Sequence, residues 1–211
     1  MARGIAWAQV NRPKESGHSR KLQFLTSAVN LQGCPSDTVP EVAIVGRSNA
    51  GKSSVINGLA NARIAQVSGT PGKTRLLNFY QTPHYRMVDM PGYGFAKRSG
   101  DEQRTWQKMI EPYLGARGNL VGLLIVMDIR RDWTEDEDNL LHWISPRQLT
   151  AGLVLTKADK LSRSEMLKRQ ALIRRQSGLE HVLVTSALKK QGFPELEDFI
   201  YQYWIKPVRE S

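Results

Sequence analysis

The chain has 211 residues, 40% hydrophobic and 24% charged, which is ordinary for a globular protein with one full core and excludes a disordered chain. Its 30 Lys and Arg against 20 Asp and Glu give a net charge of +10, which favours an anionic partner such as RNA, DNA or a membrane surface. The lone Cys34 excludes an internal disulfide and indicates a cytoplasmic location, and the longest apolar stretch, 120–127, is too short for a membrane span.

The N-terminal residues 1–21 are basic and weakly patterned, and they lack the apolar core of a secretory signal. We predict that they form a flexible arm, followed by one domain over 22–207 and a short tail over 208–211. Apolar residues between 22 and 29 could dock a short strand or turn on that domain. The rest of the arm could add a second contact with an anionic partner.

Strands and helices alternate from residue 41 onward, which predicts a mainly parallel sheet covered by helices on both faces. Six strands are expected, at 41–45, 76–81, 85–89, 120–128, 149–155 and 182–185. Helices are expected at 51–62, 102–114, 135–144 and 163–176, and a last one begins near Pro194.

Two helix starts and one helix face carry further signals. Thr134 with Glu137, and Ser162 with Glu165, have the spacing of capping boxes. In the last helix, apolar side chains recur every three or four residues and should pack on the sheet. These are Leu196, Phe199, Ile200, Tyr203 and Trp204.

The most informative motif is a complete G-x-x-x-x-G-K-S phosphate-binding loop between the first predicted strand and helix. It consists of Gly46, Arg47, Ser48, Asn49, Ala50, Gly51, Lys52 and Ser53. Glycine lets backbone N–H groups curl around a chain of phosphates. Lys52 would reach the outer phosphates, and the Ser53 hydroxyl would hold Mg²⁺.

A second motif, Asp89-Met90-Pro91-Gly92, ends the strand at 85–89. Asp89 would hold Mg²⁺ through a water, and Gly92 would bring its N–H close to a γ-phosphate. Between the two motifs, the segment 69–74 is rich in glycine and threonine. Thr74, or Thr70 as second choice, would complete the Mg²⁺ coordination when the γ-phosphate is present and release the ion after hydrolysis.

Two further motifs select the base. Thr156-Lys157-Ala158-Asp159 follows a buried strand, and the Asp159 carboxylate can accept hydrogen bonds from guanine N1–H and the 2-amino group. Adenine offers neither donor there, so the carboxylate would stay buried and unpaired. Thr185-Ser186-Ala187 follows the last strand, where the Ala187 N–H could donate to guanine O6. Together with the phosphate loop, these motifs indicate a guanine nucleotide.

In order and spacing, these motifs resemble those of the EngB (YihA/YsxC) family of bacterial ribosome-assembly GTPases, within the TrmE-Era-EngA-EngB-Septin-like class. The resemblance covers about residues 22–205 and includes 127–130 and 188–192. It implies a three-layer Ras-like P-loop GTPase fold and Mg²⁺ bound through Ser53 and Thr74. It also implies nucleotide contacts that include Gly72, Lys73, Arg75 and Leu76, a role in assembling the large ribosomal subunit, and a requirement in cell division and septation.

Hydrolysis should be slow without a partner. Lys52, Thr74 and Gly92 are the predicted catalytic residues, but Tyr93 stands where many GTPases place a glutamine that orients the attacking water, and no arginine finger is evident. We therefore predict intrinsic turnover on the order of 10⁻⁴–10⁻² s⁻¹. Asn49 could help to bind K⁺ in place of a finger, or it could simply stabilise the loop turn.

The strongest basic patch follows the base-selecting motif and is opposed by one acid, Glu165. It consists of Lys160, Arg163, Lys168, Arg169, Arg174 and Arg175. It is either a surface for rRNA phosphates or an ordinary solvated helix face. The protein is expected to act as a monomer. The alternative functions are a GTPase switch in another RNA- or membrane-linked process, a metabolic phosphoryl-transfer enzyme, and an RNA-binding scaffold with a decayed nucleotide site.

Overall fold

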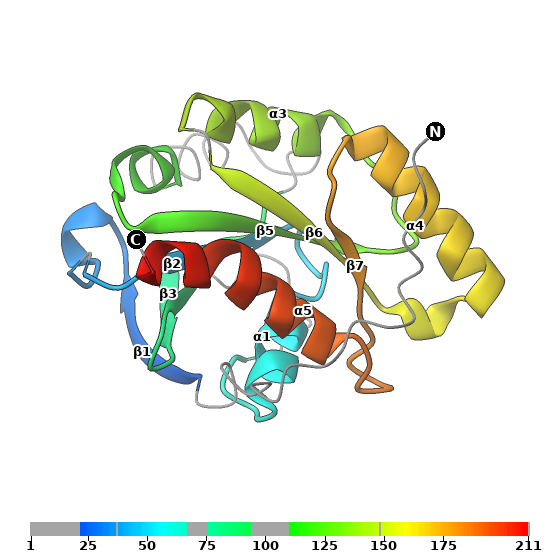
Figure 1. Ribbon diagram of the computed structural model, residues 1–211, viewed down its shortest axis with the longest axis horizontal. Coiled ribbons are helices and arrows are strands. Elements are labelled where there is room, and N and C mark those ends of the chain that lie inside the picture. Colours follow the sequence, from blue (N-terminus) through cyan, green and yellow to red (C-terminus); the bar gives the residue numbers. More distant parts are fainter. Residues whose placement is uncertain (1–21, 37, 67–75, 94–109, 148, 211) are drawn as a thin grey trace.

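The computed structural model describes residues 22–36, 38–66, 76–93, 110–147 and 149–210. Its centre is a seven-stranded sheet in the order β1-β3-β4-β2-β5-β6-β7 (Figure 1). The strands are β1 (Gln23–Ala28), β2 (Glu41–Gly46), β3 (Leu77–Gln81), β4 (Arg86–Asp89), β5 (Leu120–Asp128), β6 (Thr150–Thr156) and β7 (Val182–Val184). From β4 to β7 every neighbouring pair is parallel, whereas β1 and β3 run antiparallel to their neighbours.

The mainly parallel sheet is confirmed, but the expected number of six strands is wrong. The seventh strand, β1, pairs with β3 at the edge of the sheet. Most of its side chains are exposed, including those of Phe24 and Leu25, so it lacks the apolar alternation of a half-buried strand. Only pairing with β3, some fifty residues away in the chain, makes this segment a strand.

The three-layer arrangement is confirmed, because helices cover both faces of the sheet (Figure 1). Helix α1 (Lys52–Ala60) and helix α5 (Phe193–Ile200) pack on one face through Ile56, Leu59 and Leu196. Helices α3 (Glu135–Ile144) and α4 (Arg163–Ser177) cover the other face together with a helical segment at 110–116. Residues 102–109 of the predicted helix lie outside the described residues. No helix in the described part of the chain is both long and apolar enough to cross a membrane.

Both predicted capping boxes are present, at Thr134 and Ser162. The apolar face of the last helix is confirmed except at Tyr203, which is 57% exposed. A π-helical stretch, η5 (Tyr201–Ile205), follows α5 and changes the register, so that Ile205 is buried in place of Tyr203 while Trp204 is buried as predicted. A short helix, α6 (Lys206–Arg209), ends the chain.

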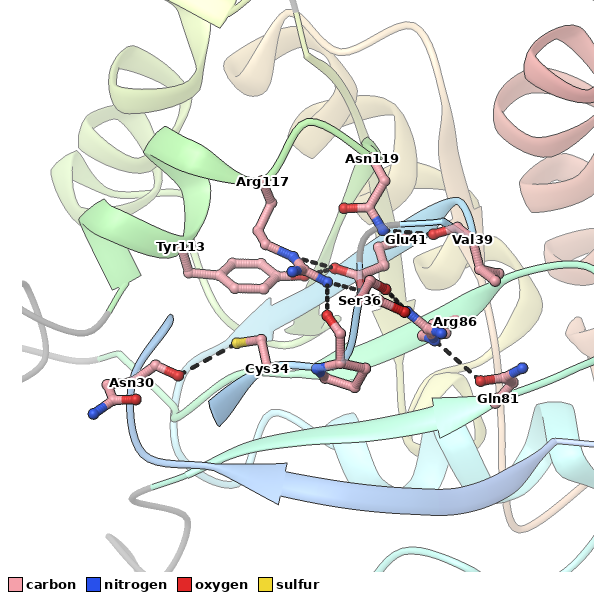
Figure 2. A network of polar contacts seen from close by, with 11 residues as sticks. Asn30, Cys34, Ser36, Val39, Glu41, Gln81, Arg86, Tyr113, Arg117 and Asn119 are labelled. Atoms are coloured by element: carbon pink, nitrogen blue, oxygen red, sulfur yellow. Dashed lines mark hydrogen bonds and ion pairs between the residues drawn. The ribbon is translucent and has the colours of Figure 1, made fainter. Parts of the chain in front are cut away.

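A buried ionic network holds the amino-terminal edge of the sheet together (Figure 2). At its centre Glu41, the first residue of β2, accepts hydrogen bonds from the Tyr113 hydroxyl (2.8 Å) and from Arg117 Nε (3.1 Å). The Arg86 guanidinium forms a second ion pair with Glu41, and Arg117 also donates to the Pro35 carbonyl. The network therefore fastens the β1–β2 connection to the edge of the sheet opposite the predicted motifs.

Candidate nucleotide-binding site

Every predicted motif in the described residues lies at the carboxyl edge of the parallel strands. The phosphate loop follows β2, Asp89 ends β4, Thr156 ends β6, and Thr185 follows β7. In open α/β sheets the crevice beyond these strand ends is where ligands bind. The topology therefore assembles in one place motifs that are separated by up to 140 residues in the sequence.

The phosphate loop has the backbone shape that its motif requires. Gly51 has a φ of 104° and Asn49 a φ of 64°, both in the left-handed region, and Ala50 N donates to the Arg47 carbonyl (3.0 Å). Helix α1 begins at Lys52, and its N-cap is Gly51, which has no side chain to cap it. The N-terminal N–H groups and the positive end of the helix dipole therefore favour an anion at this point.

Asp89 is a buried carboxylate with an unused acceptor. Among the described residues, its Oδ1 atom has no hydrogen-bond partner. Burial raises the pKa of Asp89 to about 6, although the nearby Lys52 ammonium opposes the shift. An orphaned buried oxygen beside the phosphate loop fits the water shell of a Mg²⁺ ion, which prefers oxygen ligands. Asp89 could hold the metal in this way, together with the Ser53 hydroxyl.

Asp89→Asn should stabilise the nucleotide-free protein while weakening Mg²⁺-dependent nucleotide binding. The pKa of about 6 lies above the ordinary 3.8, so the ionised carboxylate costs stability above pH 6, and this cost disappears as the pH falls toward 4. We expect a gain on the order of 1–3 kcal/mol at pH 8 and a smaller gain at pH 5. Urea unfolding without nucleotide measures both values.

The exposed Asp132→Asn is the matched control and should change stability by less than about 0.5 kcal/mol. A destabilised Asp89→Asn protein at pH 8 would contradict the prediction.

Gly92 and Tyr93 lie directly against the phosphate loop. A Cβ atom on Gly92 would stand 3.1 Å from Ser48 N and 3.2 Å from the Gly46 carbonyl, so a larger residue would crowd the loop. Tyr93 N donates to the Gly46 carbonyl (3.2 Å), and Ser48 N donates to the Tyr93 carbonyl (3.3 Å). Met90 and Pro91, the other members of this motif, are buried beside it.

The predicted base-selecting motifs also meet. The Ser186 hydroxyl donates to Asp159 Oδ1 (2.7 Å), which lowers the pKa of Asp159 and keeps the carboxylate ionised. Ala158 N donates to the Thr185 carbonyl (3.2 Å), whereas Ala187 is exposed. An ionised acceptor is thus fixed in place at the strand ends.

The same segment braces the phosphate loop. The Thr156 hydroxyl donates to the Ala50 carbonyl (2.5 Å), and Lys157 Nζ donates to the Asn49 carbonyl (2.8 Å). The stem of Lys157 must therefore cross from the base-selecting motif to the phosphate loop. This arrangement couples the two halves of one site.

Asp128 is a member of this site that the predicted site residues omit. It ends β5, and its carboxylate pairs with Lys157 Nζ (3.0 Å) and Arg130 Nη2 (2.7 Å). Burial opposes ionisation, but hydrogen bonds from Arg130 and Lys157 outweigh it and hold the pKa of Asp128 well below its usual range. Its place at the carboxyl end of the central apolar strand is a signal that could have identified it.

Some predicted site residues cannot be placed. Gly72, Lys73, Thr74 and Arg75 lie outside the described residues, as does Thr70. Leu76 immediately precedes β3 and is half-buried. The predicted contacts of segment 72–75 therefore stay predictions.

The basic patch lies largely on α4. Arg163, Lys168, Arg174 and Arg175 are exposed, and Ile173 is the only buried residue of the helix. Arg169 differs, because its side chain is only 22% exposed and its guanidinium donates to the Ile129 carbonyl (3.1 Å) and to Asp132 (3.0 Å). Arg169 thus ties α4 to the segment after β5, and the other four side chains form the accessible cationic face.

Comparisons with known proteins show the family to which the chain belongs. The sequence model of the family described as "50S ribosome-binding GTPase" matches residues 41–158. The probable GTP-binding protein EngB of Bdellovibrio bacteriovorus is 57% identical over 89% of this chain and 94% of its own length.

Two solved structures of the protein Era share the fold. Era from Aquifex aeolicus bound to GDP and AlF4⁻ superposes with a TM-score of 0.65 at 26% identity, covering 79% of this chain and 57% of that one. Era in complex with MgGDPNP and a fragment of 16S ribosomal RNA gives a TM-score of 0.63 at 25% identity, with the same two coverages. This chain therefore spans just over half the length of Era.

A phosphate loop, an Asp-x-x-Gly motif and a base-selecting carboxylate on this sheet define a P-loop GTPase of the Ras-like class. The identity to EngB proteins over most of the chain is more specific. The chain belongs to the EngB family and is a GTP-hydrolysing enzyme.

Proposed function

We propose that this protein is a Mg²⁺-dependent GTP switch whose 22–207 segment acts as one GTPase domain. The observation that carries the proposal is the double brace from Thr156 and Lys157 to the phosphate loop, which joins phosphate binding to base selection. In this proposal Asp159 recognises guanine, and Lys52 and the loop N–H groups bind the phosphates. Mg²⁺, held by Ser53, Thr74 and Asp89, would neutralise phosphate charge.

The remaining predicted contacts complete the proposed GTP/GDP site. Gly92 N–H would meet the γ-phosphate, with Thr74 as the switch residue and Lys52 as the third catalytic residue. Ala187 N–H would approach guanine O6. The switch is favoured over a metabolic phosphoryl-transfer enzyme by the family assignment, and over a scaffold with a decayed site by the intact Lys52, Ser53, Asp89 and Asp159.

We further propose that the switch works in the cytoplasm, as a monomer, on precursors of the large ribosomal subunit, with a consequent requirement in cell division and septation. The family resemblance supports these roles, and the matching sequence model described as "50S ribosome-binding GTPase" supports a ribosomal partner. The 16S ribosomal RNA fragment bound to the similar protein Era supports only the binding of rRNA. The exposed face of α4, with Lys160 beside it, is the proposed surface for rRNA phosphates.

Reversing two charges on this face should weaken particle binding. Lys168 and Arg175 are seven residues apart on α4 and share one side of the helix. With a non-hydrolysable GTP analogue, the double change Lys168→Glu and Arg175→Glu should reduce co-sedimentation with large subunits. It should also make the dependence of log affinity on log salt shallower by roughly one to two units.

The control is the double change Arg63→Glu and Lys206→Glu, at exposed residues away from α4. It alters the net charge by the same amount as the α4 variant, and it should leave binding to large subunits unchanged. Equal loss in both variants would show a general charge effect and refute the α4 surface. If wild-type protein bound large subunits equally well with GDP and with the GTP analogue, the proposed switch would be refuted.

Potassium is a second proposed cofactor. Asn49 is exposed at the tip of the phosphate loop, and its left-handed backbone is one that asparagine tolerates well. We expect slow intrinsic hydrolysis that is faster in KCl than in NaCl, measured as phosphate release. Equal rates in the two salts would refute potassium binding, and Asn49 would then serve only to stabilise the loop turn.

A further inference from the structure

Glu137, in the first turn of α3, is buried at the meeting point of three parts of the site. Its side chain is 1% exposed. Oε1 accepts hydrogen bonds from the Tyr93 hydroxyl (3.0 Å) and from Arg47 Nε (3.0 Å), and Oε2 accepts the Thr134 N–H (2.9 Å) and hydroxyl (2.6 Å). The Glu137 carboxylate therefore caps the start of α3 and also binds Tyr93 and Arg47.

Arg47 brings the phosphate loop into this cluster. Its Nη2 atom donates to the Thr134 hydroxyl (2.6 Å) and to Asp136 Oδ2 (2.6 Å), in addition to the bond from Nε to Glu137. The second residue of the phosphate loop is thus held by the acidic N-terminus of α3. These charge-assisted bonds are stronger than neutral ones and have a fixed geometry.

Tyr93 brings the Asp-x-x-Gly motif into the same cluster. Its ring is buried, and its hydroxyl bonds to Glu137, while its backbone pairs with Gly46 and Ser48 of the phosphate loop. Gly92 precedes it, and a Cβ atom added there would stand 3.1 Å from Ser48 N, so this peptide lies close to the phosphate loop. The orientation of the Gly92 peptide is therefore set by a side chain that Glu137 holds in place.

We propose that Glu137 is a positioning residue for GTP: through Tyr93 and Arg47 it holds Gly92 N–H and the phosphate loop in the arrangement that receives a γ-phosphate. The inference rests on the proposed role of Gly92. GDP lacks the γ-phosphate, so the cluster should favour triphosphate over diphosphate. Tyr93 then acts through its hydroxyl bond to α3, and it does not orient water.

The test compares two buried tyrosines that make the same kind of bond. Tyr93→Phe removes a hydroxyl bound to Glu137, and Tyr113→Phe removes one bound to Glu41 at the opposite edge of the sheet. We expect Tyr93→Phe and Glu137→Gln to lower the ratio of affinities for a non-hydrolysable GTP analogue and GDP about five- to tenfold, since a hydrogen bond to a charged group is lost. The double variant should lose little more than Glu137→Gln alone, because both changes act on the bond between Tyr93 and Glu137.

Tyr113→Phe should lower thermal stability to a similar degree and leave the affinity ratio unchanged. An unchanged ratio in Tyr93→Phe and Glu137→Gln, with wild-type protein binding both nucleotides, would overturn the inference. Equal loss of the ratio in Tyr113→Phe would also overturn it, because the effect would then be general destabilisation. Failure of wild-type protein to bind either nucleotide would instead refute the proposed function.

Discussion

Asp159→Asn should weaken GTP binding by about 10³-fold and improve binding of XTP. Ser186 donates to Oδ1, so the asparagine oxygen would stay with Ser186 and the new NH₂ group would face the base. The N1–H and 2-amino donors of guanine would then face another donor, the asparagine NH₂ group. Unpaired buried polar groups carry a large free-energy penalty, so GTP affinity should fall. Xanthine has a carbonyl in place of the 2-amino group and would accept from the NH₂. Titration with GTP, XTP and ATP measures the change.

The matched control is Asp132→Asn, since Asp132 is 75% exposed and pairs with Arg169 of α4. It should bind GTP like the wild type. GTP affinity of Asp159→Asn within tenfold of wild type would show that this carboxylate does not recognise the base. Wild-type affinity for ATP equal to that for GTP would lead to the same conclusion.

Glu41→Gln should destabilise the fold by about 3–5 kcal/mol, because breaking a buried ion pair leaves uncompensated charge. Glu41 is fully buried, and it is the carboxylate that the buried guanidinium groups of Arg86 and Arg117 share. The neutral amide would leave both cations without their counter-charge. Urea unfolding should show a lower midpoint with an unchanged slope.

Nucleotide affinity of folded Glu41→Gln should stay close to that of wild type, because Glu41 begins β2 and the phosphate loop starts at the other end of that strand. Glu180→Gln, at a residue whose side chain is 81% exposed, is the control and should change stability by less than about 0.5 kcal/mol. A loss below about 1 kcal/mol in Glu41→Gln would mean that Tyr113 and the arginines are held by other contacts.

The sequence alone determined the strand–helix alternation and the place of the phosphate loop within it. Continuous apolar strands such as β5, and capping residues such as Ser162, depend on neighbours within a few residues. Such local patterns can be recognised from the sequence alone. Because each motif directly follows a strand, the sequence also indicated that Asp89 and Asp159 would meet at one edge of a parallel sheet.

Only the tertiary structure decided which distant side chains share a partner. Strand β1 exists because β3 pairs with it, Arg169 is bound by the segment after β5, and Asp128 bridges Lys157 and Arg130. The link from Arg47 to Glu137 joins residues ninety positions apart. Such contacts form when the layers of the fold pack together and charged groups leave water. A buried charge then needs a partner, and the packing of the layers determines which side chain is near enough. No spacing along the chain therefore encodes these contacts.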